Sequence, residues 1–373
     1  MARPHAAAIV EDAWHRQVDR ALRRRHWTNR VIGHVGYGSS DFVRVFARVV
    51  LSRPKDPPPD DGLREDEPDK KAEKKAGDKT YGGLRSLDGR RRGWRVFFTA
   101  PAMDVPVTVT VGDHRAHGRS DRSGHVDLTF RGTGLDAGWH SATVEAQNSE
   151  PVQVPIFVVG DDVTFGIVSD IDDTVISTSL PRMFLAAYNT FVKHEGTRRV
   201  VPGMAPLYRA LLAEHPGAPT VYVSTGAWNT APPLTRFLKN HGYPMGPLLL
   251  TDWGPTNTGW FRSGRQHKRA CLDRLARDFP HIRWVLVGDD GQHDLEVYSD
   301  FSEARPECIE AVAIRQLTPT EQMLSHGIPV PTDELTRNPR TPREIPIYYA
   351  PDGFGLLRIL RQAGKVSEAA EPG

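Results

Sequence analysis

The stretch that decides the fold is residues 163–174, which read Val-Thr-Phe-Gly-Ile-Val-Ser-Asp-Ile-Asp-Asp-Thr. Its first half is mostly apolar and rich in β-branched residues, which predicts a buried strand. The carboxylates of Asp170, Asp172 and Asp173 follow at once, and aspartate disfavours strands, so the strand ends there. Carboxylates this close raise one another's pKa unless a cation lies between them, and Mg²⁺ prefers such oxygen ligands. We therefore predict a strand that leads into a magnesium site, with an ordinary polar turn as the alternative.

The composition is that of a globular protein with more than one domain. The chain has 373 residues, of which 39% are hydrophobic and 25% charged, so we expect two domains with a sizeable core. A formal net charge of +2 is too small to indicate nucleic-acid binding. The two cysteines are too few for a disulfide framework or a structural zinc site.

The N-terminal segment, residues 1–29, is predicted to hold one amphipathic helix over residues 5–27. Its polar side ends in Arg23-Arg24-Arg25-His26, and cations in a last helical turn complement the helix dipole. A basic amphipathic helix can also lie on anionic lipid. We favour packing on the protein, with peripheral membrane contact as the alternative. Because the sequence shows neither a long apolar run nor a secretory signal, we expect a cytoplasmic protein.

Residues 30–160 are predicted to form a small antiparallel β-sandwich. Phe42–Leu51 alternates like a half-buried strand, whereas residues 53–79 are Pro-rich, charged and without apolar periodicity, which indicates a disordered loop. We interpret three nearby histidines of this region as solvated turn residues: His114, His117 and His125. Further strands are predicted at Trp94–Thr99, Val107–Val111, Val126–Phe130, Ser141–Ala146 and Val152–Val158.

Residues 161–330 change character, because strand patterns now alternate with helical ones, as in a parallel α/β sheet. A helical insertion, Val175–Arg199, is predicted after the acidic turn, and residues 331–373 are predicted to form a C-terminal extension with a helix near Gly353–Gln362. The predicted strands are Val163–Ser169, Thr220–Ser224, Pro247–Leu250, Trp284–Val287 and Ile309–Ile314. The predicted helices are 203–212, 232–242, 267–279, 294–301 and 320–326.

Polar groups stand where these strands end. Ser224 and Thr225 follow the second strand and could hold a phosphate oxygen. Lys268 begins the helix before the fourth strand, and lysine is a suitable point charge for a phosphoryl group. Residues 288–294, Gly-Asp-Asp-Gly-Gln-His-Asp, follow the fourth strand. Because ligands of open α/β sheets bind beyond the carboxyl ends of the strands, we expect these groups to share one pocket.

In this order the motifs resemble the haloacid dehalogenase superfamily of phosphotransferases. The finer motifs are residues 169–174, Tyr222-Val223-Ser224 with Trp228, His267-Lys268, and residues 288–298. Over about residues 160–315 these motifs look like the catalytic domain of the actin-patch phosphatidate phosphatase family. The resemblance implies a Rossmann-like parallel sheet of the haloacid dehalogenase type, preceded by the β-sandwich domain and the N-terminal helix. Many relatives carry serine where this chain has Asp290, so the second acid of the metal site stays open between Asp290 and Asp294.

The resemblance also implies a role for each site residue. Asp170 would attack phosphorus and form an aspartyl-phosphate, and Asp172 would protonate the leaving alcohol and then activate water. Thr174 would hold the turn. Ser224, Thr225 and Lys268 would bind the phosphate. The Mg²⁺ ligands would be Asp170, Asp172 through its backbone carbonyl, Asp289 and, as the favoured second acid, Asp294.

Three functions are compatible with these motifs. The first is a Mg²⁺-dependent phosphatase that converts phosphatidate to diacylglycerol, and the second is a phosphatase of a soluble phosphomonoester. The third, a non-catalytic binding protein, is disfavoured because every motif position holds a competent residue. Apolar residues of the insertion, such as Met183 and Phe184, could approach lipid or pack on the sheet.

Overall fold

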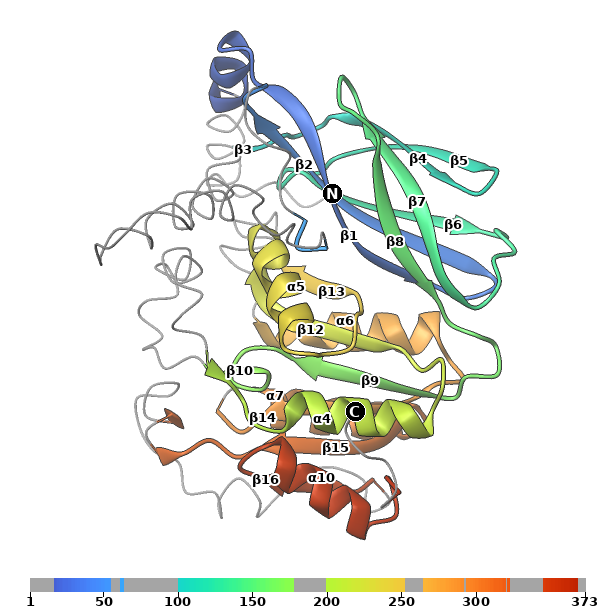
Figure 1. Ribbon diagram of the computed structural model, residues 1–373, viewed down its shortest axis with the longest axis vertical. Helices are drawn as coiled ribbons and strands as arrows, with labels where there is room; N and C mark the ends of the chain where they lie inside the picture. The colour runs from blue at the N-terminus through green and yellow to red at the C-terminus, as the bar shows by residue number, and fades with distance from the viewer. Residues whose placement is uncertain are drawn as a thin grey trace, which may run out of the picture.

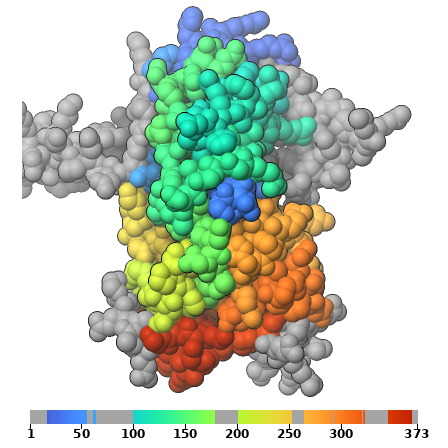
Figure 2. Space-filling view, turned by 90° about the vertical axis from the view of Figure 1, so that its right-hand side faces the viewer, coloured from blue at the N-terminus to red at the C-terminus, as the bar shows by residue number. Residues whose placement is uncertain are grey.

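The computed structural model shows two stacked domains, a β domain and an α/β domain (Figure 1). The structure describes residues 17–54, 61–63, 100–177, 199–251, 264–291, 293–319, 321–322 and 345–367. The predictions for the interior of the insertion, for the strand at 94–99, and for most of the charged loop and of the 320–326 helix lie outside the described residues. Figure 2 shows the β domain (blue to green) resting on the α/β domain (yellow to red) along a broad boundary.

The β domain is one curled, mixed sheet. Its strands are β1 (Thr28–Gly38), β2 (Phe42–Ser52), β3 (Ala100–Pro101), β4 (Pro106–Val111), β5 (His114–Arg119), β6 (His125–Arg131), β7 (Gly138–Ala146) and β8 (Val152–Val158). The order is β3-β2-β1-β8-β7-β4-β5, and β6 pairs with β2 on the edge that β3 also uses. The prediction of an antiparallel sandwich is wrong in two respects: the described strands form one sheet and not two packed sheets, and β1 and β8 run parallel. β1 and β5 were not predicted.

Strand β2 is buried on both faces, whereas the sequence predicted a half-buried strand. Val43, Val45 and Val49 lie in the core of the β domain. On the other face, Phe42 and Phe46 share a core with the α/β domain. The predicted assignment of residues to the two faces of the strand is confirmed, but the face expected to contact solvent is covered by the α/β domain.

The contact between the domains is aromatic. The rings of Tyr37 and Phe42 each lie 5.7 Å from the ring of Phe279, which follows helix α6 (Gly264–Asp278). The Tyr37 hydroxyl also donates a hydrogen bond of 2.7 Å to Asp278. The two domains are therefore joined by a packed interface with a directional contact.

The α/β domain contains a six-stranded parallel sheet of order β13-β12-β9-β14-β15-β16. Its strands are β9 (Phe165–Asp170), β12 (Thr220–Ala227), β13 (Leu248–Thr251), β14 (Arg283–Asp289), β15 (Ile309–Arg315) and β16 (Ile347–Ala350). A two-stranded pair, β10 (Ile176–Ser177) and β11 (Arg199–Val200), lies at the two ends of the insertion. The predicted parallel sheet is confirmed, while β16 was not predicted.

Helices cover both faces of this sheet. Helices α4 (Met204–Glu214), α5 (Ala231–Asn240) and α10 (Gly353–Gln362) share one core, and α6 (Gly264–Asp278) and α7 (Asp294–Ala304) share the other. Two short 3-10 helices are η5 (Trp228–Thr230) and η6 (Pro306–Cys308). Helix α5 has proline in its first turn, as predicted, where no N–H partner is needed. In α10 the Asp352 carboxylate caps the helix by accepting a 2.8 Å hydrogen bond from the Gly355 amide.

The chain changes direction within the sheet between β9 and β14. From β9 it runs outward through β12 and β13, then returns to β14 and continues outward through β15 and β16. The carboxyl ends of β9 and β14 therefore stand side by side at a topological switch point. This is the place where open α/β sheets bind ligands.

The N-terminal helix is described only over residues 17–24. Leu22 and Trp27 pack against the core of the β domain, and the Arg23 guanidinium donates hydrogen bonds to Asp19 and Asn29. This part of the segment packs on the protein, while membrane contact stays a prediction. Among the described helices, none combines the length and the apolar character that crossing a membrane requires.

Candidate active site

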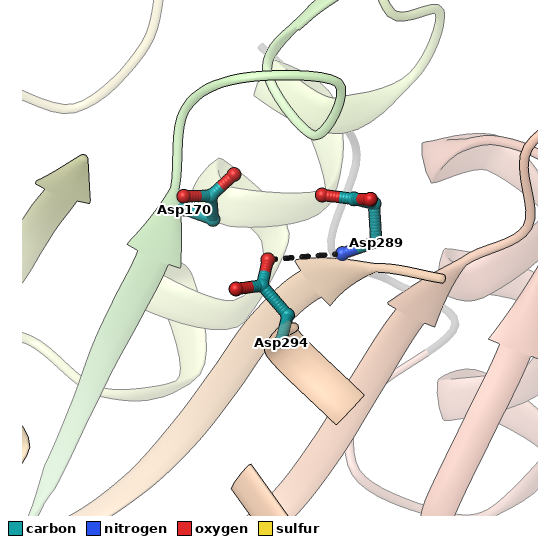
Figure 3. A group of neighbouring side chains, drawn as sticks. All are labelled: Asp170, Asp289 and Asp294. Carbon is teal, nitrogen blue, oxygen red and sulfur yellow. Dashed lines mark hydrogen bonds between the residues drawn. The ribbon is translucent and has the colours of Figure 1, made fainter. Parts of the chain in front are cut away.

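Three carboxylates converge at the switch point (Figure 3). Asp170 ends β9, Asp289 ends β14 and Asp294 begins α7. Each offers one oxygen, and these oxygens lie within 4.8 Å of one another. All three side chains are at most 1% exposed. The Asp289 amide donates a long hydrogen bond of 3.4 Å to Asp294, which ties the two ends of residues 289–294 together.

Lys268 is the cation of this cluster. Its ammonium, on α6, lies 2.6 Å from Asp170 and also pairs with Asp294. Burial would lower the pKa of Lys268, but the surrounding carboxylates outweigh burial and raise that pKa. Burial, and next to it the charge of Asp294, hold the pKa values of Asp170 and Asp289 well above their usual range, with Lys268 opposing this. One lysine thus faces three buried carboxylates.

The described residues fit a hard divalent cation. The Oδ2 atom of Asp170 is buried and accepts no hydrogen bond from any described residue. The Oδ1 atom of Asp289 accepts a hydrogen bond of 2.7 Å from the Gly291 amide. Its Oδ2 atom has only a long hydrogen bond of 3.5 Å, from the Thr174 hydroxyl. Buried carboxylate oxygens without strong donors are suitable ligands for Mg²⁺, which requires oxygen.

Asp290 faces away from this cluster. One of its carboxylate oxygens accepts a 2.8 Å hydrogen bond from the Leu317 amide. The backbone amide of Asp290 donates a hydrogen bond of 3.0 Å to the carbonyl of Arg315. The structure therefore groups Asp294, and not Asp290, with Asp170 and Asp289, although the role of Asp294 as a metal ligand stays a prediction.

Asp172 and Ser224 form the neighbouring part of the site. The Ser224 hydroxyl donates a 2.8 Å hydrogen bond to the Asp172 carboxylate and accepts 3.0 Å from the Gly226 amide. The parallel pairing of β12 with β9 ends at Val223 and Asp170, and Ser224 is the next residue of β12. Because Asp172 follows β9 at the same edge of the sheet, the two strands bring these side chains together. The Asp172 carboxylate is outside the three-carboxylate group, which leaves it available for proton transfer.

Three residues singled out by the sequence lie beside the site. Thr225 is half-buried and its side chain faces Gly264, at the start of α6. His267 packs with its ring nitrogen 3.2 Å from the carbonyl of Leu249. Trp228 is 6% exposed and lies in the interface with the β domain.

His125 corrects another prediction, because it is not a solvated turn residue. Its ring stacks on Trp228 with the centroids 4.1 Å apart. Burial lowers the pKa of His125 to about 4. His34, which the sequence analysis did not single out, has its ring 5.2 Å from Trp228, and burial lowers the pKa of His34 to about 3.

Two further contacts were not predicted. The Ser169 hydroxyl donates 2.6 Å to the carbonyl of Asp170 and lies 2.5 Å from the Tyr208 hydroxyl. The Arg315 guanidinium donates 2.6 Å to the carbonyl of Asp173. Ser169 belongs to the motif of residues 169–174, but nothing in the sequence indicated its hydrogen-bond partners. Tyr208 resembles any core aromatic, and Arg315 resembles any charge at a strand end.

Comparison with known proteins agrees with this geometry. Residues 165–316 match the family described as phosphatidate phosphatase APP1, catalytic domain. The chain is 29% identical over 151 residues to phosphatidate phosphatase APP1 of Saccharomyces cerevisiae, which covers 40% of this chain and 25% of that protein. It is 28% identical over 160 residues to an uncharacterized protein of Schizosaccharomyces pombe, with the same coverage of 40% and 25%. The chain thus spans about a quarter of the length of these relatives.

Over residues 165–316 the chain is therefore similar to the phosphatidate phosphatase APP1 catalytic-domain family, as the motifs of the sequence indicated. Among solved structures, a carbohydrate acetylesterase from Xanthomonas citri overlaps 83% of this chain and 75% of its own. At 10% identity and a TM-score of 0.25 this likeness carries no argument.

Proposed function

We propose that this protein is a Mg²⁺-dependent phosphatase that hydrolyses phosphatidate to diacylglycerol and phosphate through an aspartyl-phosphate on Asp170. The observation that carries the proposal is the convergence of Asp170, Asp289 and Asp294 with Lys268 at the switch point. The family match of the same segment supports phosphatase chemistry. The yeast relative's description as a phosphatidate phosphatase supports the choice of substrate.

In the first step the Asp170 carboxylate attacks phosphorus, so that an Asp170–phosphorus bond forms while the bond from phosphorus to the ester oxygen breaks. Asp172 gives its proton to the leaving alcohol. In the second step Asp172, now a carboxylate, takes a proton from water, and that water displaces phosphate from Asp170. Ser224 holds Asp172 in position through the 2.8 Å hydrogen bond.

Asp170, Asp289 and Asp294 would hold the magnesium ion. When bound, the ion supplies positive charge that lets a carboxylate approach an anionic phosphate. Lys268 supplies a second positive charge at Asp170, so its ammonium can both orient the nucleophile and accompany a phosphate oxygen. Because Lys268 is buried, its charge acts at close range with little screening by water.

A soluble phosphomonoester remains the alternative substrate, because the proposed roles of Lys268 and Ser224 concern the phosphate, which lipid and soluble esters share. A non-catalytic binding protein is disfavoured, since the described nucleophile, acid and lysine are all competent and in contact with site partners.

The test measures phosphate release from phosphatidate vesicles and from a panel of soluble phosphomonoesters, with and without Mg²⁺. We expect release from phosphatidate to require Mg²⁺ and to be lost in Asp170→Asn. Asp162→Asn, which changes an exposed aspartate in the turn before β9, is the matched control and should retain activity. Activity of purified Asp170→Asn near the wild-type level would refute the mechanism, and release from soluble esters alone would refute the substrate.

A further inference from the structure

Arg315 reaches from the end of β15 to the turn that follows β9. It is 6% exposed, and β14 separates its strand from β9. Its Nη1 atom donates a 2.6 Å hydrogen bond to the carbonyl of Asp173, and its Nε atom donates 3.3 Å to the carbonyl of Pro351. A buried guanidinium thus spans three segments at the carboxyl edge of the sheet.

The turn that Arg315 contacts is tight and strained. Asp173 has a φ of 58°, a left-handed conformation that is unfavourable for a residue with a Cβ. Hydrogen bonds of 2.7 Å from the Asp173 amide to Ile176 and of 2.9 Å from the Val175 amide to Ile171 close the turn. Asp173 stands between two site residues, Asp172 and Thr174. The shape of this turn therefore sets where the Asp172 carboxylate lies against Ser224.

Glu321 connects Arg315 to the base of the insertion. One carboxylate oxygen of Glu321 lies 2.7 Å from Arg315 and accepts 3.0 Å from the hydroxyl of Ser177, at the end of β10. The other oxygen accepts 2.9 Å from the Thr318 amide. Burial would raise the pKa of Glu321, but the hydrogen bonds from Arg315 and Thr318 outweigh it and hold that pKa below its usual value. The Arg315–Glu321 contact is therefore an ion pair.

From this geometry we propose that Arg315 is a positioning residue for the phosphatase reaction. With Glu321 it fixes the turn of residues 171–176, and through the turn it aims Asp172 at the reacting oxygen. The inference rests on the proposed function. A buried ion pair contributes little net stability compared with apolar side chains of the same size, whereas its hydrogen bonds have fixed directions. Hydrogen bonds of fixed direction are what is needed to hold a strained turn in one conformation.

The experiment compares Arg315→Met and Arg315→Lys in the full chain, with the most active phosphomonoester of the panel as substrate. We expect Arg315→Met to lower kcat by about 10-fold to 100-fold, the scale of a misplaced catalytic group, with KM near the wild-type value. Arg315→Lys should recover part of kcat, because lysine can donate one of the lost hydrogen bonds. Amide hydrogen exchange in the peptide of residues 171–177 should become faster in Arg315→Met.

Arg283→Met is the matched control. Arg283 also donates to a backbone carbonyl, that of Ile309 at 2.9 Å, and pairs with Glu310 at 3.1 Å, but it begins β14 at the opposite edge of the sheet. This variant should keep the wild-type kcat and the wild-type exchange in residues 171–177. Any loss shared by Arg283→Met would point to a general effect of removing a charge from the sheet.

A kcat of Arg315→Met near wild type, with unchanged exchange, would overturn the proposal. So would a loss of activity that tracks a lower melting temperature and is not relieved by lysine. Should Arg315→Met fail to fold, Glu321→Gln carries the same test with a smaller expected loss. Faster exchange in a protein whose wild type is inactive on every substrate would reject the proposed function while supporting the action of Arg315 on the turn.

Discussion

Asp289→Asn removes one negative charge from the carboxylate cluster but leaves the size and shape of the side chain almost unchanged. Asparagine keeps an oxygen for the 2.7 Å hydrogen bond from the Gly291 amide but removes one negative charge. At the limiting separation of 4.8 Å, two unit charges repel by about 3 kcal/mol at an effective dielectric constant of about 20. Lys268 offsets part of this repulsion, and proton uptake relieves more of it. We therefore expect metal-free Asp289→Asn to be more stable than wild type by on the order of 1–2 kcal/mol.

The assay is thermal melting in a chelator and across a Mg²⁺ titration. A gain of 1 kcal/mol raises the melting temperature by about 2–4 °C in a domain of 150–250 residues. Wild type should gain stability with Mg²⁺, by about 2.7 kcal/mol when the ion is at 100 times its Kd. Asp289→Asn should melt above wild type in the chelator and gain little from Mg²⁺.

Asp290→Ser is the matched control, because Asp290 is the adjacent acid but bonds to the Leu317 amide. Losing that acceptor leaves a buried amide unsatisfied, so this variant should lose about 1–3 kcal/mol with and without Mg²⁺. A metal-free Asp289→Asn that melts below wild type and keeps the full Mg²⁺ response would refute the reasoning. An Asp290→Ser variant without a Mg²⁺ response would make Asp290 the second acid.

Three further outcomes follow from the same contacts. Asp170→Asn should lower the phosphatase rate by at least ~10³-fold, measured as phosphate release by the purified variant, with the fold unchanged. Burial lowers the pKa of His34 to about 3 and that of His125 to about 4, so the folded protein binds protons at these rings less readily than the unfolded chain. The stability that the neutral rings allow is therefore fully present above pH ~6.5 and is lost as the pH falls toward these two values. In melts between pH 7 and pH 4, His34→Phe should show a smaller fall of the melting temperature with pH than wild type. Deleting residues 1–24 should lower the melting temperature, because Leu22 packs on the β domain, and should leave co-sedimentation with anionic vesicles unchanged if packing is the helix's only role.

The parallel sheet could be predicted because its signal is local. Apolar runs such as residues 163–169 end in polar residues, and a buried parallel strand has few other readings. The order of the motifs then placed Asp170, Lys268 and Asp289 at one edge, where the structure also has them. β16 escaped prediction because its four residues, Ile347–Ala350, carry two tyrosines and show no clear apolar run.

Contacts between distant segments could not be predicted in the same way. The alternation in β2 showed which residues share a face, but not that Phe46 and its neighbours would be covered by another domain. The histidine spacing gave no sign that His125 stacks on Trp228, about a hundred residues away. The role of Arg315 could not be predicted from the sequence either, because its partner is the backbone carbonyl of Asp173, a group that every residue has.

The folding unit that holds the site is larger than the segment that matches the family. Residues 165–316 end just after β15, yet β16 extends the sheet beyond β15 and Leu356 and Leu360 of α10 share a core with Ile167 of β9. On the opposite face, Phe42 and Phe46 of the β domain complete the second core. Excising the matched segment would expose both surfaces to water, at about 25 cal/mol for each Å² of apolar area. The 3-10 helix η5, which follows β12, would also lose the ring of His125 that stacks on Trp228. The matched segment is therefore packed on both of its faces by residues that lie outside it.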